Sequence, residues 1–226
     1  MTIDLGKMGY FDRFIYNRIA AGELPGDDTI CREVLAWVGD ESSKHDWRDP
    51  VPTLPACLGV NVLVTSSDNR MLLVRRSRGV GTSPLSWQVS AAELAHREKD
   101  LASGKLDVAS IMQRAVWEEC GVELEHIRET RILEFGLELS LYQHLFLGHI
   151  LTDLDEDGLR LAASRAPDRN LEQEELVFVP FTSKEVPRFV REIIDVGQGF
   201  MPASVPCIIA ALKHMYPSSR PERAFK

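Results

Sequence analysis

Two hydrophobic periods follow one another along the sequence. Near the N-terminus, apolar residues recur at helical spacing, which predicts two amphipathic helices, one over residues 9–21 and one that ends near Gly39. The polar, proline-rich stretch after Gly39 is typical of a connector. We therefore predict an N-terminal helical arm and connector at residues 1–55. This arm could cover the main domain, form a homodimer interface or shape a substrate pocket.

The main domain is predicted over residues 56–226, where strand patterns alternate with helical ones. The segments L-G-V-N-V-L-V-T and R-M-L-L-V-R-R-S, joined by the turn S-S-D-N, predict a β-hairpin. Alternating residues predict two further strands over 130–139 and 141–151, and helical spacing predicts two helices over 183–194 and 203–216. The run H-R-E-K-D and the segment Leu161–Asn170 are expected to be exposed loops. This mixture of strands and helices predicts an α/β domain.

One further helix is predicted between these strands, and it carries the densest group of charges. Arg114 and Glu118 lie one turn apart on its face and can form an ion pair. Glu119 lies about a hundred degrees further round. Asp107 is a candidate N-cap, and Gly121 suits the left-handed residue that ends a helix. The opposite side is an apolar stripe that can pack on a sheet, formed by Val108, Ile111, Met112, Ala115 and Val116.

The adjacent carboxylates of Glu118 and Glu119 repel each other on a rigid helix unless a positive charge lies beside them. A hard cation such as Mg²⁺ or Mn²⁺, which prefers carboxylate oxygens, would remove this repulsion. The alternative is a solvated helix face whose charges serve only solubility.

The segment Gln113–Leu124, Q-R-A-V-W-E-E-C-G-V-E-L, resembles the second half of the Nudix signature, R-E-U-x-E-E-x-G-U, in which U is aliphatic. The matching residues are Arg114, Val116, Glu118, Glu119, Gly121 and Val122, whereas Ala115 replaces the first glutamate. The front half of the signature corresponds to W-Q-V-S-A-A-E, from Trp87 to Glu93, with Ser90-Ala91-Ala92 in place of Pro-Gly-Gly. The two halves are further apart than in the family, which predicts a loop insertion around Arg97–Lys105.

The resemblance implies a Nudix-type α/β/α sandwich with a mixed β-sheet, extended by the N-terminal helical arm. It implies that Glu118 and Glu119 bind the divalent ion and that Arg114 holds Glu118 in place. A further metal ligand is expected just before the last strand, where Glu172, Glu174 and Glu175 are candidates and Glu174 is favoured. The family often takes its general base from the signature helix. Because Ala115 occupies that position, the base would come from Glu119, Glu93 or the late acidic cluster, or be missing.

Candidate substrate-binding residues lie at the end of the predicted hairpin. The basic run of Arg75, Arg76 and Arg78 could meet phosphate oxygens, for which guanidinium groups are well suited. Its alternative role is to protect an exposed strand end with charge. The resemblance adds Trp87, at the end of the following strand, to the substrate-binding candidates.

Composition narrows the function classes. The net charge of −8 argues against general binding to nucleic-acid polymers or membranes. Four scattered cysteines and the lack of a signal-like or membrane-spanning apolar run predict a cytoplasmic protein. The leading hypothesis is a metal-dependent hydrolase that cleaves a diphosphate linkage in a nucleoside diphosphate derivative or another organic diphosphate. The alternatives are a catalytically impaired Nudix-like binding or regulatory protein, and an isomerase-like enzyme that leaves the diphosphate intact.

Overall fold

A computed structural model of the chain describes residues 57–80, 83–100, 105–138, 143–168 and 173–217, together with Ala36. The chain divides into two compact units, one made of Met1–Leu58 and Gly136–Leu145, the other of Gly59–Phe135 and Phe146–Lys226. Apart from Ala36, the predicted N-terminal arm lies outside the described residues, and its boundary near residue 55 stays a prediction.

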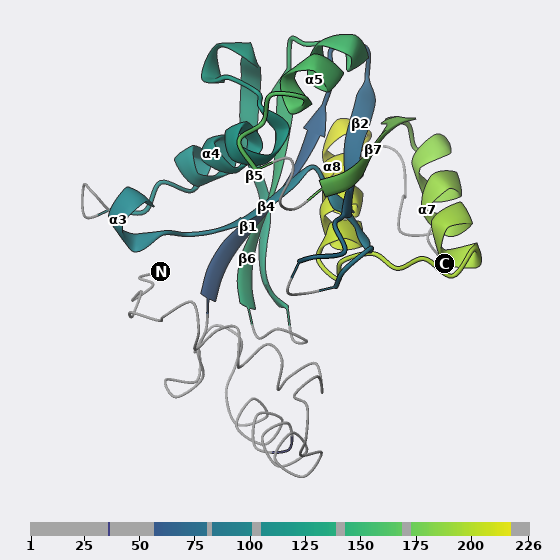
Figure 1. The fold of residues 1–226 in the computed structure, drawn as a ribbon, viewed down its shortest axis with the longest axis horizontal. Coiled ribbons are helices and arrows are strands. Elements are labelled where there is room, and N and C mark those ends of the chain that lie inside the picture. Colours follow the sequence, from purple (N-terminus) through teal and green to yellow (C-terminus); the bar gives the residue numbers. More distant parts are fainter. Residues whose placement is uncertain are drawn as a thin grey trace. The chain divides into compact units, whose positions relative to one another are not determined.

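The described residues form one seven-stranded sheet and the helices that flank it (Figure 1). The strand order is β3-β2-β1-β6-β5, while β4 pairs with β1 and β7 pairs with β2. The strands are β1 (Cys57–Thr65), β2 (Arg70–Arg76), β3 (Trp87–Val89), β4 (Ala91–Leu94), β5 (Ile127–Glu138), β6 (Gln143–Thr152) and β7 (Gln173–Pro180). The helices are α3 (Arg97–Asp100), α4 (Val108–Cys120), the short 3-10 helix Leu124–His126, α5 (Glu156–Ala163), α7 (Glu185–Asp195) and α8 (Ser204–Met215).

Helices α4 and α8 cover opposite faces of the sheet (Figure 1). The predicted α/β fold with a mixed sheet is therefore confirmed. No helix of the described part of the chain is long and apolar enough to cross a membrane.

The predicted hairpin between β1 and β2 is present, and its turn ends at Asn69. The backbone of Asn69 has a φ of 61°, a left-handed conformation that asparagine tolerates better than most residues. Beyond the turn the two strands pair through Val64 with Leu72 and Thr65 with Met71.

A bend between β3 and β4 bridges β1 and β2. Strand β3 pairs with β2, and β4 pairs with β1, so the chain passes from one strand to the other at Ser90. The Ser90 hydroxyl accepts a hydrogen bond from the Val64 N–H at 2.7 Å and donates one to the Leu72 carbonyl at 2.6 Å. The hydroxyl thus links β1 and β2 where they separate, and it fixes the bend that carries Ala92 and Glu93.

Helix α4 begins and ends as predicted. The Asp107 carboxylate caps its N-terminus by accepting hydrogen bonds from the N–H groups of Ala109 and Ser110. Gly121 ends the helix with a φ of 66°. A Cβ atom at Gly121 would lie 2.2 Å from the Ala162 carbonyl oxygen of α5, so only glycine fits there.

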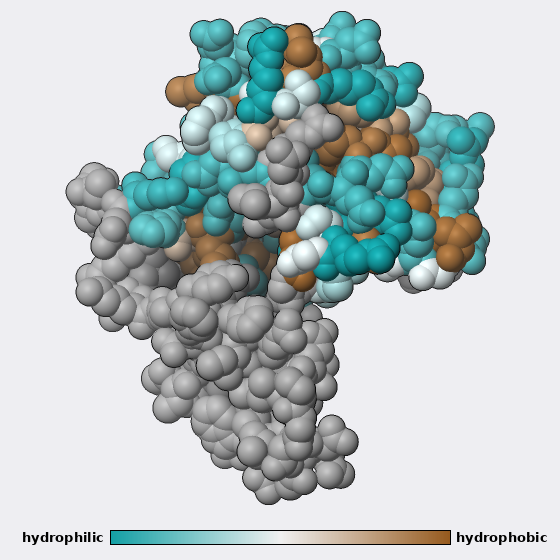
Figure 2. Space-filling view, in the orientation of Figure 1, coloured by the Kyte–Doolittle hydropathy of each residue, from teal (hydrophilic) through white to brown (hydrophobic). Residues whose placement is uncertain are grey.

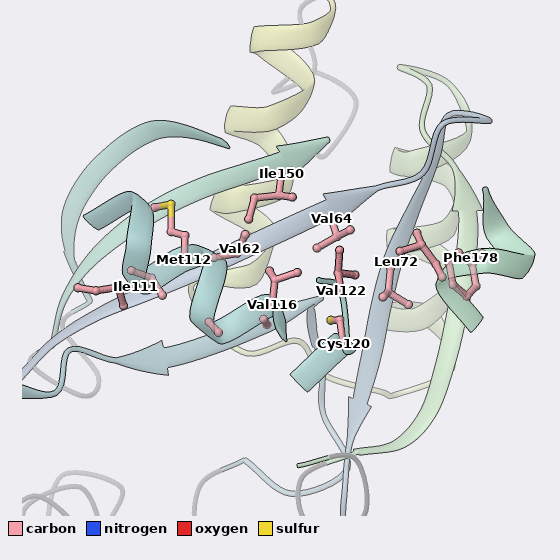
Figure 3. Packing of buried hydrophobic residues seen from close by; sticks show 14 residues of the cluster. Val62, Val64, Leu72, Ile111, Met112, Val116, Cys120, Val122, Ile150 and Phe178 are labelled. Atoms are coloured by element: carbon pink, nitrogen blue, oxygen red, sulfur yellow. The ribbon is translucent and has the colours of Figure 1, made fainter. Parts of the chain in front are cut away.

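The apolar side of α4 packs on the sheet, as the sequence predicts. Figure 3 shows Met112, Val116 and Cys120 facing the side chains of Val62 and Val64 on β1. This packing fixes the helix that carries the signature carboxylates.

Two loop predictions are wrong. The segment Leu161–Asn170 is not wholly a loop, because α5 extends to Ala163 and Leu159 is fully buried. Asp155 of the preceding acidic stretch caps α5 by accepting a hydrogen bond from the Gly158 N–H at 2.8 Å. The run H-R-E-K-D contains α3, whose contacts reach the candidate site.

Candidate functional site

Arg114 lies at the centre of three carboxylates. Its Nη1 atom is 3.0 Å from Glu118 Oε2 and 3.5 Å from Glu93 Oε2. Its Nη2 atom is 2.9 Å from Asp100 Oδ2 and donates a hydrogen bond to the Leu94 carbonyl at 3.2 Å. The predicted ion pair between Arg114 and Glu118 is present, and Glu93 and Asp100 join it. We call Glu93, Asp100, Arg114 and Glu118 the acid cluster.

Helix α3 supplies one member of the acid cluster and a second cation. The Asp100 side chain is only 6% exposed, and its carboxylate also accepts a hydrogen bond from the His96 N–H at 2.6 Å. Lys99 Nζ lies 3.3 Å from Glu118 Oε1. No sequence pattern points to these contacts, because Asp100 matches no position of the Nudix signature. On the face shown in Figure 2, the region of α3 is hydrophilic.

Burial and crowding change the acidity of the cluster. Burial raises the pKa of Glu93, and the nearby Glu118 carboxylate raises it further. The hydrogen bond from the Leu94 N–H and the charge of Arg114 act in the opposite direction. Burial alone would lower the pKa of Arg114, but Asp100 and the other two carboxylates of the cluster outweigh it and raise that pKa. Arg114 is therefore a permanent cation in this site.

Glu119 belongs to a separate, buried set of contacts. Its side chain accepts a hydrogen bond from the Ala92 N–H at 2.8 Å and one from Gln88 Nε2 at 3.4 Å, and the residue is 3% exposed. Gln88 Oε1 in turn accepts a hydrogen bond from Arg76 Nη1 at 2.6 Å. Glu118 and Glu119, adjacent in sequence, thus lie in two different networks that meet at the β3–β4 bend.

The last strand reaches this region through Gln173. Its Nε2 atom donates a hydrogen bond to the Glu119 backbone carbonyl at 2.7 Å, and its Oε1 atom is buried without a hydrogen-bond partner. Glu174 and Glu175 are exposed, and Glu172 lies outside the described residues. Gln173 was not predicted from the sequence, because only acidic side chains were candidates before the last strand. The metal-ligand role of Glu174 stays a prediction.

The basic run is split between surface and interior. Arg75 donates a hydrogen bond to the Leu85 carbonyl and forms an ion pair with Glu175, Arg76 is buried, and Arg78 is exposed. Trp87 is 4% exposed, and its Nε1 atom donates a hydrogen bond to Gln198 Oε1 at 2.6 Å. The predicted substrate-binding roles of these residues remain predictions.

The acid cluster contains two carboxylates, those of Glu93 and Glu118, that could bind a divalent ion. Among the described residues, no group of three or more histidine, cysteine, aspartate or glutamate side chains is arranged to hold a metal. Glu93 and Glu118 nevertheless direct carboxylate oxygens to the same Arg114 nitrogen. Mg²⁺ is commonly held by one or two carboxylates together with water and substrate phosphates. The Glu93–Glu118 pair therefore fits an ion that arrives with a phosphorylated ligand. Ala115, fully buried, adds no oxygen.

A groove of about 470 Å³ lies elsewhere, between β5 and α8. It contains no member of the acid cluster, and its Arg131 is engaged by Glu129 and His214. The acid cluster is the better candidate for chemistry, because its carboxylates are crowded and one has a raised pKa.

No family model and no curated protein matches the sequence. The solved structures that are similar to the chain include the following three. DR0079 from Deinococcus radiodurans has a TM-score of 0.49 at 15% identity, covering 76% of this chain and 96% of its own. The bifunctional NMN adenylyltransferase/ADP ribose pyrophosphatase from Francisella tularensis, complexed with AMP and Mn, has a TM-score of 0.43 at 12% sequence identity. The match covers 83% of this chain and 49% of that protein's chain. The MutT NUDIX hydrolase from Burkholderia pseudomallei has a TM-score of 0.43 at 14% sequence identity, and the match covers 69% of this chain and 97% of that protein's chain.

One of these structures is a Nudix hydrolase, the family whose signature the segment Gln113–Leu124 resembles.

Proposed function

We propose that the chain is a hydrolase that depends on Mg²⁺ or Mn²⁺ and cleaves a diphosphate linkage in a nucleoside diphosphate derivative or another organic diphosphate. The observation that supports this most is the pairing of Glu93 and Glu118 against one nitrogen of Arg114. The carboxylates of Glu93 and Glu118 share one guanidinium nitrogen and repel each other. A divalent ion bound between them would offset this repulsion.

The residues of the acid cluster have separate tasks in this proposal. Glu93 and Glu118 hold the ion, and Arg114 holds Glu118. A divalent ion bound there would offset phosphate charge and make a coordinated water more acidic. If Glu118 alone holds the ion, Glu93 is a candidate proton acceptor, because burial raises its pKa towards the working pH of a general base. The Glu119 carboxylate accepts a hydrogen bond from the Ala92 N–H in the β3–β4 bend and so stabilises the strand that carries Glu93.

A second function has its own supporting observation. The position of the first signature glutamate is Ala115, which is buried in the core, and no described group of three residues is arranged for a metal. These features suit a binding or regulatory protein that recognises a diphosphate compound without cleaving it. An isomerase-like enzyme, which would rearrange the organic part, remains the third candidate.

Incubation with a panel of organic diphosphates, followed by mass detection, separates the three functions. The hydrolase predicts a phosphorylated product that requires Mg²⁺ or Mn²⁺ and disappears in Glu118→Gln. The matched control is Glu125→Gln, since the Glu125 side chain is 81% exposed and lies outside the cluster. Thermal stabilisation by a compound that stays intact would instead indicate the binding protein. A rearranged compound with its diphosphate retained would indicate the isomerase.

The proposal includes a small-molecule partner and a cytoplasmic location. The homodimer predicted from the N-terminal arm concerns residues outside the described part of the chain. Analytical ultracentrifugation of the full chain tests that prediction directly.

A further inference from the structure

A buried polar island lies between β2, β3, β7 and the end of α4. It consists of Arg76, Gln88, Glu119 and Gln173, and Gln88 is fully buried. Arg76 contacts Gln88, Gln88 contacts Glu119, and Gln173 binds the Glu119 backbone. The side chain of Glu119 is thus connected to a buried cation through one amide group.

The chemistry of Arg76 fixes the orientation of that amide. A guanidinium group has only donors, so the oxygen of Gln88 must face Arg76. The amide nitrogen of Gln88 must then face the Glu119 carboxylate, which accepts the hydrogen bond. Arg76 therefore fixes the orientation in which the Gln88 amide donates its hydrogen bond to the Glu119 carboxylate.

Burial makes this arrangement consequential. A buried carboxylate that loses a hydrogen-bond donor must change its conformation or admit water. The Glu119 side chain also accepts a hydrogen bond from the N–H of Ala92, the residue immediately before Glu93. A displacement of Glu119 would therefore be transmitted to the strand that carries Glu93 into the acid cluster.

We propose that Gln88 and Arg76 are positioning residues, which hold the Glu119 carboxylate against the β3–β4 bend and thereby set the position of Glu93. Arg76 acts from the interior and does not contact the substrate, unlike the role that the basic run suggests. The metal-binding consequence rests on the proposed function, whereas the positioning itself does not.

Amide hydrogen exchange in the metal-free protein tests the positioning. In Gln88→Met the Ala92 N–H is expected to exchange about tenfold faster or more, because loss of a hydrogen bond to a charged group is worth at least that factor. Gln113→Met is the matched control. Its Nε2 atom donates a hydrogen bond to Thr130 Oγ1 at 3.1 Å, away from the island, so Ala92 exchange should stay unchanged.

Arg76→Met gives an independent variant should Gln88→Met fail to fold, and it should also accelerate Ala92 exchange. Circular dichroism verifies that each variant is folded. Unchanged Ala92 exchange in folded Gln88→Met or Arg76→Met would overturn the proposal. An increased KM in Arg76→Met with unchanged exchange would likewise overturn it, in favour of direct phosphate contact.

Mn²⁺ titration of the same proteins separates this inference from the proposed function. If wild type binds Mn²⁺, Gln88→Met should bind it about tenfold more weakly, while Gln113→Met binds it as wild type does. Equal affinity of wild type and Gln88→Met overturns the link from the island to the metal site. If wild type binds no Mn²⁺ even with a diphosphate compound present, the proposed metal dependence fails, and accelerated Ala92 exchange would still establish the positioning.

Discussion

Lys99 Nζ and Glu118 Oε1 lie 3.3 Å apart, so a lysine of α3 contacts the carboxylate that we propose to bind a divalent ion. The lysine is 55% exposed, and such surface ion pairs contribute about 0–1 kcal/mol. A divalent ion would compete with Lys99 for the same oxygen.

Lys99→Met is therefore expected to raise the affinity for Mn²⁺ by about two- to fivefold at low ionic strength, while stability changes by less than about 1 kcal/mol. Calorimetric titration measures the affinity. Lys105→Met, which removes another exposed lysine of the same segment, serves as the control and should leave the affinity unchanged. Weaker Mn²⁺ binding in Lys99→Met would show that the lysine supports the site rather than competing for it.

Glu93→Gln is expected to change the pH dependence of stability. The folded-state pKa of Glu93 is raised, chiefly by burial, so its neutral form is favoured in the folded protein and its contribution is lost as pH rises through that pKa. Glutamine mimics the neutral form. The variant should therefore gain about 2 °C in Tm relative to wild type between pH 4 and pH 8, a small effect because the group is partly exposed. A difference in Tm that does not grow with pH would contradict the raised pKa.

His149 should make the protein sensitive to acid. Its Nε2 atom shares a hydrogen bond with Thr65 Oγ1 at 3.0 Å, its Nδ1 atom is buried without a partner, and burial lowers its pKa to about 4. The neutral ring is therefore favoured in the folded protein. Its contribution is complete above the unfolded pKa near 6.5 and is lost as pH falls towards 4.

Urea unfolding of wild type and His149→Gln at several pH values tests this expectation. The unfolding free energy of wild type minus that of His149→Gln should fall by about 3 kcal/mol from pH 7 to pH 4. Parallel curves would mean that His149 does not titrate between these limits.

Ser90→Ala is expected to destabilise the protein by about 3 kcal/mol, because it leaves the Val64 N–H and the Leu72 carbonyl without their hydroxyl partner in the core. Ser110→Ala is the control, since the Ser110 hydroxyl bonds the Asp107 carboxylate at an exposed position and should cost about 0.5 kcal/mol. Urea unfolding measures both. Equal losses in the two variants would refute the bridging role of Ser90.

Features that depend on neighbouring residues could be predicted from the sequence. Each cap of α4, Asp107 at its start and Gly121 at its end, follows from the residues next to it in the sequence. The ion pair of Arg114 with Glu118 follows from their spacing of one helical turn. The β1–β2 hairpin follows in the same way from alternation and its turn residues.

Features that depend on distant segments could not be predicted in this way. Asp100 contacts Arg114, which lies 14 residues further along the sequence, and Gln173 contacts Glu119 from a separation of 54 residues. The role of Ser90 exists only because β1 and β2 separate beside it. Such contacts have no local pattern, and the metal and substrate roles of the site residues accordingly stay predictions.

The close approach of Gly121 to the Ala162 carbonyl determines which side of the acid cluster can adjust. This contact holds the last turn of α4 against the backbone of α5, so the backbone positions of Glu118 and Glu119 are fixed. Asp100 and Lys99, by contrast, belong to a helix of four residues. If the proposed function holds, α3 is the side of the cluster that would shift to admit a phosphate group, and a change in the length of this helix should alter ligand preference without touching the signature helix.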